Sequence, residues 1–246
     1  MTQRHDIDFI FAEWPYQPGA ISARVVRAVD GREVLQMRIE MGLLQMEVIG
    51  RPDGEKPGGC ASYLEWIKQQ IAETDPATPL TEEQCFEIDR EFLQYYHRRI
   101  CCLALREFDR AVVDADHTLA LMDFVAAHSP DEQWTQSHER YRPFVHFHRA
   151  QASALAVLER SGPEAAIEEI NHGLEQLRKL FTDHEAEERF EQDELVVQLQ
   201  ELKESLRNEY HVGKTLAEQL ADAVAAEEYE RAAKLRDEIA RRKRIV

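Results

Sequence analysis

Apolar residues recur at three- and four-residue steps through most of the chain beyond residue 60, and this periodicity constrains the fold more than any other feature. Tyr63, Leu64, Ile67 and Ile71 form the first such stripe. This spacing places side chains on one face of an α-helix. Thr81, followed three residues later by a glutamine, fits the capping-box signature of a helix start. We therefore predict a mainly α protein.

Residues 22–50 follow a different pattern. Apolar and polar residues alternate on both sides of Asp30-Gly31, and a third apolar run follows Gly42. Alternation with a turn that tolerates positive φ predicts a β-hairpin, and a third strand makes a small antiparallel β-meander. We expect this sheet to bury the face that carries Leu35, Met37 and Ile39.

An aromatic cluster precedes the predicted sheet. It contains Phe9, Phe11, Trp14 and Tyr16. Such a cluster can cover one face of the sheet, or it can form a ligand-binding box. Aromatic residues next to a small sheet are more often part of its core, so we favour the first interpretation.

The middle of the chain contains two predicted helical hairpins. One turns near Arg106-Glu107, and the other turns at residues 161–164, around Gly162-Pro163. Small residues suit two closely packed helices, and they recur around both turns: Ala104, Ala111, Ala150 and Ala165. The arrangement resembles the tetratricopeptide class of helical repeat in architecture, although its spacing is longer than in that family. If these hairpins form a groove, the resemblance implies that it would be a peptide-binding surface.

Residues 182–208 read as one charged helix that is rich in acids in its first half. Leu195, Leu199, Leu202 and Leu206 form a narrow apolar seam along it. Two interpretations remain open: the helix lies on the helical body, or it forms a short coiled coil with a partner or with a second copy.

Two short helices are predicted at the C-terminus, with a break at Glu227-Glu228. Leu216, Leu220 and Val224 share one stripe of the first helix. The second helix carries a corresponding set in fixed register: Tyr229, Ala232, Ala233, Leu235, Arg236, Asp237 and Ile239. Paired alanines let the two backbones approach. A hairpin of this length buries little of its own apolar surface, so we expect a foreign surface to cover it.

This C-terminal segment resembles the UVR motif, named for the UvrB and UvrC excision-repair proteins. The resemblance implies protein docking through Leu216, Leu220, Val224, Tyr229 and the rest of that set. It also implies that the partner is another protein, such as an excision-repair subunit, a Clp-type chaperone or a second copy of the chain. One departure is visible, because the family often has Asp or Asn where this chain has Glu228, a weaker helix cap.

Charge restricts the classes of partner. The 47 acidic residues outnumber the 30 Lys and Arg, which gives a formal net charge of −17. A field of this sign repels phosphate backbones and acidic membrane surfaces. The exception is the basic cluster at residues 241–244, which either complements the helix dipole or contacts nucleic acid. The second alternative would make the protein a DNA-repair accessory factor.

No motif predicts an enzyme, a metal site or a cofactor. The glycines of residues 50–59 lack the lysine and hydroxyl residue of a phosphate-binding loop. His146, His148, Cys101 and Cys102 lack the convergent spacing of a zinc site. Cys101 and Cys102 are predicted to be buried thiols.

We predict four segments. They are a β-meander unit at residues 1–58, a helical-hairpin body at 59–181, a connecting helix at 182–210 and the UVR-like hairpin at 211–246. No apolar stretch is long enough to span a membrane, and the N-terminus has no secretion signal, so a cytoplasmic location is expected. The expected function is that of a non-enzymatic adaptor.

Overall fold

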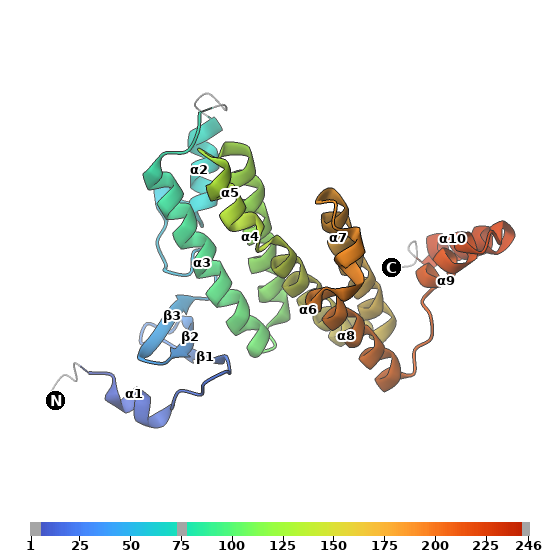
Figure 1. Cartoon of the computed structure of the whole chain (residues 1–246). Coiled ribbons are helices and arrows are strands. Elements are labelled where there is room, and N and C mark those ends of the chain that lie inside the picture. Colours follow the sequence, from blue (N-terminus) through green and yellow to red (C-terminus); the bar gives the residue numbers. More distant parts are fainter. Residues whose placement is uncertain (1–5, 73–77, 243–246) are drawn as a thin grey trace. The chain divides into compact units, whose positions relative to one another are not determined.

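The computed structural model describes residues 6–72 and 78–242 (Figure 1). The chain divides into two compact units, Met1–Arg149 and Ala150–Val246. Each unit is described by itself below. The four-segment division expected from the sequence stays a prediction. The protein is mainly α-helical, with a small antiparallel sheet near the N-terminus and two helices at the C-terminus, as the sequence predicts.

The sheet contains three antiparallel strands in the order β1 (Ser22–Arg27), β2 (Glu33–Ile39) and β3 (Gly42–Glu47). Val25 of β1 pairs with Leu35 of β2, which pairs with Met46 of β3. The turn between β1 and β2 contains Gly31 at φ +87°, a conformation that favours glycine. The predicted meander and its turn are therefore confirmed.

The prediction of which face the sheet buries was incomplete. Leu35 is 1% exposed, but Ile39 on the same face is 37% exposed. On the opposite face, Gln36 and Arg38 are buried although they are polar. The reason is that the N-terminal aromatic segment covers this face by cation–π contacts, with the Arg38 guanidinium 4.2 Å from the centroid of the Phe11 ring.

Trp14 completes this cover. The guanidinium of Arg24 lies 4.3 Å from the centroid of the Trp14 ring, and the Trp14 carbonyl accepts a hydrogen bond from Arg38 Nε at 3.0 Å. Gln36 accepts a hydrogen bond from Arg24 Nε at 2.9 Å. The aromatic segment thus serves as cover for the sheet, which is the favoured interpretation of the sequence.

The first unit contains five helices and the beginning of a sixth within its described residues. These are α1 (Asp8–Glu13), α2 (Tyr63–Ala72), α3 (Glu82–Ala104), α4 (Phe108–His128), α5 (Glu132–Glu139) and α6 (Arg142–Ser161). Thr81 caps α3 with the predicted capping box, because its hydroxyl accepts from Gln84 N while the Gln84 side chain accepts from Thr81 N. The predicted stop after α2 falls largely on residues 73–77, which lie outside the described residues.

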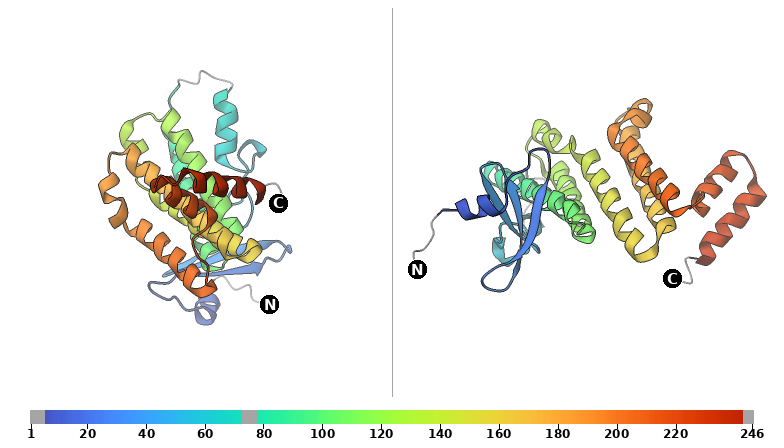
Figure 2. Two further views of the ribbon diagram at one scale, coloured as in Figure 1. Left: turned by 90° about the vertical axis from the view of Figure 1, so that its right-hand side faces the viewer. Right: turned by 90° about the horizontal axis from the view of Figure 1, so that it is seen from below.

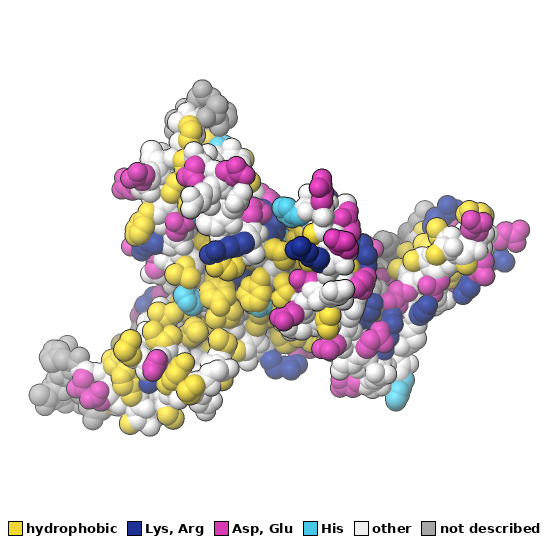
Figure 3. Space-filling model, viewed as in Figure 1, with side chains coloured by type: hydrophobic (Ala, Val, Ile, Leu, Met, Phe, Trp, Pro, Cys, Tyr) yellow, Lys and Arg dark blue, Asp and Glu magenta, His cyan; other side chains and the backbone are white. Residues whose placement is uncertain are grey.

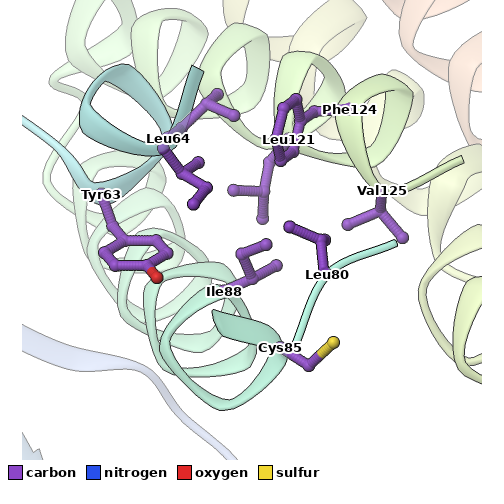
Figure 4. Close-up of a cluster of buried hydrophobic side chains, with 9 residues drawn as sticks. Tyr63, Leu64, Leu80, Cys85, Ile88, Leu121, Phe124 and Val125 are labelled. Atoms are coloured by element: carbon purple, nitrogen blue, oxygen red, sulfur yellow. The ribbon is translucent and has the colours of Figure 1, made fainter. Parts of the chain in front are cut away.

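Helices α2, α3 and α4 enclose an apolar cluster (Figure 4). Leu64 from α2, Ile88 from α3 and Leu121 from α4 point toward one another, and Leu80 closes the cluster from the segment before α3. Ile88 and Leu121 are fully buried. Burial of this kind contributes about 1.5–3 kcal/mol for each large side chain.

A buried ion pair ties the sheet to the helices. Arg98 of α3 lies 2.6 Å from Asp114 of α4, and the same guanidinium donates to the carbonyls of Glu47 and Gly50 at 2.9 and 2.7 Å. These two carbonyls belong to the segment that leaves β3. These contacts hold the segment after β3 against α3. The loop of residues 51–59 begins at the end of that segment.

The second unit begins within α6 and continues with α7 (Pro163–Asp183), a 3-10 segment η2 (Glu187–Gln192) and α8 (Glu194–Tyr210). The prediction of one helix over residues 182–208 was wrong. Glu185 adopts φ +53°, and Ala186 N donates to Phe181 O, which ends α7. Asp193 then starts α8 by accepting hydrogen bonds from Leu195 N and Val196 N.

Helix α8 packs on α7 within this unit. Val196, Leu199 and Leu206 are its buried residues, whereas Leu195 and Leu202 are only half-buried. This supports the interpretation in which the helix lies on the helical body. The likeness of the helical hairpins to tetratricopeptide repeats stays a prediction.

Two further helices follow, α9 (Leu216–Ala225) and α10 (Tyr229–Arg242). They lie side by side and antiparallel, as the right-hand view of Figure 2 shows. They form the C-terminal hairpin that the sequence predicts.

Candidate protein-docking hairpin

Capping interactions fix both ends of α9. Thr215 and Glu218 form a capping box, in which the Thr215 hydroxyl accepts from Glu218 N and the Glu218 carboxylate accepts from Thr215 N. At the other end, Glu227 adopts φ +58° and Glu228 N donates to Ala223 O at 2.8 Å. This left-handed residue reverses the chain at the predicted break.

The hairpin has a very small core of its own. Ala223, Ala232 and Leu235 are buried, and Leu216 and Leu220 pack against them. The two alanines contribute little apolar area but let the helices lie close together. Ala223 was missed in the sequence, although its position three residues after Leu220 is the signal that places it on the inner face of α9.

Other predicted docking residues lie outside this core. Val224 is 53% exposed and Tyr229 is 68% exposed. Ala233, which is half-buried, and the exposed Arg236 follow Tyr229 at helical spacing, so these three residues share one face of α10. Figure 3 shows hydrophobic side chains along the hairpin. The sequence treats Leu216, Leu235 and Tyr229 as one docking stripe, whereas the structure divides them between an inner and an outer face.

The remaining predicted residues lie near the end of α10. Ile239 is half-buried, whereas Arg236 and Asp237 are exposed. Arg236 Nε lies 3.7 Å from Asp237 Oδ1, so this ion pair joins neighbours on one helix and does not link α10 to α9. The side chain of Arg241 is exposed, and Lys243 and Arg244 of the basic cluster lie outside the described residues.

Ion pairs join the hairpin to α8. The Glu218 carboxylate pairs with Arg207, and Lys203 Nζ lies 3.7 Å from it. Burial alone would raise the pKa of Glu218, but hydrogen bonds from Thr215 N, Asn171 and Arg207 lower it below its usual range. The sequence predicts no such contact, because charges from separate helices meet only in the folded chain.

The turn of this hairpin has a counterpart between α3 and α4. Residues 107–111 read Glu-Phe-Asp-Arg-Ala, and residues 228–232 read Glu-Tyr-Glu-Arg-Ala. Arg106 and Glu227 are both left-handed, at φ +60° and +58°. The amides of Glu107 and Glu228 each donate, at 2.8 Å, to the carbonyl five residues earlier.

The two turns differ in the exposure of their aromatic residue. Phe108 is 5% exposed, whereas Tyr229 at the matching position is 68% exposed. The alanine three residues later is buried in both hairpins, Ala111 at 0% and Ala232 at 8%. The same turn is therefore covered by surrounding structure in one hairpin and left uncovered in the other.

A family model described as the UvrB/uvrC motif matches residues 214–244. The chain carries a UVR motif. The match spans the hairpin from just before Thr215 to the end of α10, so the resemblance seen in the sequence is confirmed for this segment. We call α9 and α10 the UVR hairpin. No curated protein and no solved structure matches the chain.

The groups with potential metal or thiol chemistry are packed into the first unit. Cys101 and Cys102 are buried, as predicted, and burial raises the pKa of each thiol to about 12. Burial lowers the pKa of His148 to about 3, with a further contribution from Arg99. Among residues 6–72 and 78–242, no three His, Cys, Asp or Glu side chains gather as metal ligands. In the same ranges, no helix combines the length and apolar character needed to cross a bilayer.

Proposed function

We propose that this protein is a non-enzymatic adaptor that docks on another protein through its UVR hairpin. The observation that carries the proposal is the exposed Tyr229, together with its buried counterpart Phe108. A turn of similar sequence and the same backbone geometry buries its aromatic residue where neighbouring structure covers it. The UVR hairpin leaves this position open for a partner.

Energetics supports this assignment. Burying an aromatic or a valine side chain contributes about 1.5–3 kcal/mol. Tyr229 and Val224 together therefore offer several kcal/mol to a partner that covers them. Aromatic residues that enter a pocket are also typical anchors of protein interfaces. The small internal core of Ala223, Ala232 and Leu235 holds the two helices in place without using these side chains.

The partner that this proposal favours is another short helical hairpin. Such a unit has the same shortage of internal core, so two of them can cover each other's exposed face. Candidate partners are an excision-repair subunit, a Clp-type chaperone or a second copy of this chain. Sedimentation velocity of the purified protein over a range of concentrations separates self-association from binding to a different protein.

The decisive test is capture of partners from cell lysate with the full chain, followed by mass spectrometry. Tyr229→Glu places a charge in the proposed interface and should remove the captured partners. Tyr210→Glu is the matched control, because Tyr210 is 44% exposed at the end of α8 and lies outside the hairpin. The proposal fails if Tyr229→Glu captures the same proteins as the natural chain while both variants retain their helical circular dichroism.

A DNA-repair accessory role is the alternative, with the basic cluster at residues 241–244 contacting nucleic acid. It predicts DNA binding that weakens steeply with salt and disappears when these four residues are deleted. The charge of −17 argues against it. Fluorescence anisotropy with a labelled duplex distinguishes the two functions, because the adaptor requires no DNA binding at physiological salt.

A further inference from the structure

The loop that follows the sheet forms one wall of a surface cavity in the first unit. The cavity has a volume of about 470 Å³. Its walls come from the loop residues Glu55 and Pro57, from Tyr63 and Trp66 of α2, and from Glu87 of α3. It is far from the UVR hairpin in sequence, and none of its residues takes part in the function proposed above.

Two aromatic rings form one side of the cavity. The centroids of the Tyr63 and Trp66 rings are 5.2 Å apart, with an interplanar angle of 49°. Gly58 crosses beside the indole at φ +56°, and a Cβ at this position would lie 2.3 Å from Trp66 Cδ1. Glycine is therefore required where the loop passes the indole, and this close contact shapes the aromatic wall.

Carboxylates surround the other side. The buried guanidinium of Arg51 has four of them within 4 Å: Glu87 at 2.8 Å, Asp53 at 3.2 Å, and Glu55 and Glu91 at 3.7 Å each. One guanidinium carries a single positive charge. Arg51 therefore holds these acids together but does not neutralise them.

The remaining cations do not remove the negative excess. Arg90 lies 2.7 Å from Glu87 and 3.4 Å from Asp53, and Lys56 lines the cavity. The four carboxylates around Arg51 outnumber the three cations Arg51, Arg90 and Lys56 by one charge. Burial raises the pKa of Tyr63 to about 12. The negative charges of Glu87 and Glu83 also raise this pKa, each by more than the positive charge of Arg51 lowers it.

We propose that this cavity binds the guanidinium of an arginine side chain from another protein. A flat cation stacks on an aromatic face, and its N–H groups match the oxygens of a carboxylate. Arg51 shows that the site accommodates this chemistry, because its guanidinium lies 5.9 Å from the centroid of the Tyr63 ring and pairs with Glu87. In the proposed complex, the arriving guanidinium stacks on Trp66 and pairs with Glu55, whose side chain is 60% exposed.

The test is an NMR titration of the full chain with N-acetyl-arginine methylamide, following the indole N–H resonance of Trp66. N-acetyl-citrulline methylamide is the matched probe, because it has nearly the same shape and no charge. We expect a saturable shift with the arginine compound and none with the citrulline compound. Trp66→Phe assigns the indole resonance among the three tryptophans.

Variants locate the binding within the cavity. Glu55→Gln should weaken binding about tenfold, because it removes the charge-assisted acceptor of the arriving guanidinium. Glu175→Gln is the control, since Glu175 is an exposed residue of α7. Glu55 is 60% exposed and lies 3.7 Å from Arg51, so Glu55→Gln leaves the closer ion pairs of Arg51 in place and a folded protein is available for the measurement.

Three results would each overturn the proposal. They are an equal shift with the citrulline compound, an unchanged affinity in Glu55→Gln, and the absence of a saturable shift at millimolar arginine compound. Agmatine provides an additional comparison, because it carries the guanidinium without a peptide backbone. Binding of agmatine alone would assign the cavity to a free small cation and would contradict a protein side chain as the ligand.

Discussion

Helices α6 and α7 pack closely at Gly173 and Ala150, and exchanging these two residues gives a sharp test of the packing. A Cβ on Gly173 would lie 2.3 Å from Ala150 Cβ. Ordinary carbon contacts are about 3.5–4.0 Å, so the shortfall is roughly 1.2–1.7 Å. Both atoms are attached directly to the backbone, and no change of rotamer relieves the clash.

Gly173→Ala should therefore destabilise the second unit. Overpacking of this kind costs about 1–3 kcal/mol, and the better helix propensity of alanine returns about 1 kcal/mol. With no rotamer to absorb the clash, we expect a net loss of about 2 kcal/mol. Ala150→Gly should also cost about 2 kcal/mol, from lost propensity and one buried methyl group.

The double variant distinguishes a steric pair from two independent sites. Additivity predicts a total loss of about 4 kcal/mol from those two costs. A steric pair predicts less than about 1 kcal/mol, because the methyl group has only changed helices. The next nearest atom to a Cβ on Gly173 would be Ala150 Cα at 3.5 Å, which is an ordinary contact distance. The clash therefore involves the Ala150 methyl group, which the double variant removes.

The assay is urea unfolding followed by far-UV circular dichroism. Gly213→Ala is the control, because a Cβ there meets nothing within 4 Å and its φ is not positive. It should change stability by less than about 1 kcal/mol. Additive losses in the double variant, or an unaffected Gly173→Ala, would show that α6 and α7 are not packed at this distance.

Three further outcomes follow from the first unit. Glu91→Gln should lower the free energy of unfolding in urea by about 2–3 kcal/mol. The fully buried Glu91 carboxylate accepts hydrogen bonds from the backbone amides of Tyr63 and Leu64 at 2.6 and 3.0 Å, and a neutral side-chain amide replaces it poorly. Folding lowers the pKa of His148 from its ordinary 6.5 to about 3, so between these pH values the unfolded chain binds a proton that the folded chain does not. The free energy of unfolding should therefore decrease as pH falls from 6.5 toward 3, by up to about 1.4 kcal/mol per pH unit. His148→Gln should reduce that slope in acid titrations of stability. Brief alkylation of the native protein at neutral pH should label Cys60 and spare Cys101 and Cys102. Burial raises the pKa of Cys101 and of Cys102 to about 12, so neither forms the reactive thiolate at neutral pH. Mass spectrometry after proteolysis identifies the labelled cysteines.

The UVR hairpin shows how far a local pattern predicts a site. The break at Glu227-Glu228 and the two apolar stripes follow from helical spacing alone. The division into an inner and an outer face does not, because it depends on how α9 rotates against α10. Val224 continues the stripe of Leu216 and Leu220 in the sequence, yet Ala223 takes the inner position and leaves Val224 exposed.

The sheet shows the same limit. Alternation correctly predicts three strands and their turn, since it reflects the geometry of each strand. It favours Leu35, Met37 and Ile39 as the buried face, and it gives no reason to bury Arg38. Burial of Arg38 depends on Phe11 and on the Trp14 carbonyl, which come from a separate segment.

By itself, the sequence determined the three strands and most of the helices, showed where Thr81 begins a helix, and identified the UVR motif in the C-terminal segment. Those features arise from interactions within a few residues, which a linear pattern records. Only the tertiary structure decided that Glu218 meets Arg207, that Arg51 gathers four carboxylates, and that Tyr229 is left exposed where Phe108 is buried. These contacts join residues distant in the chain, and their strength depends on burial, which the chain acquires only on folding.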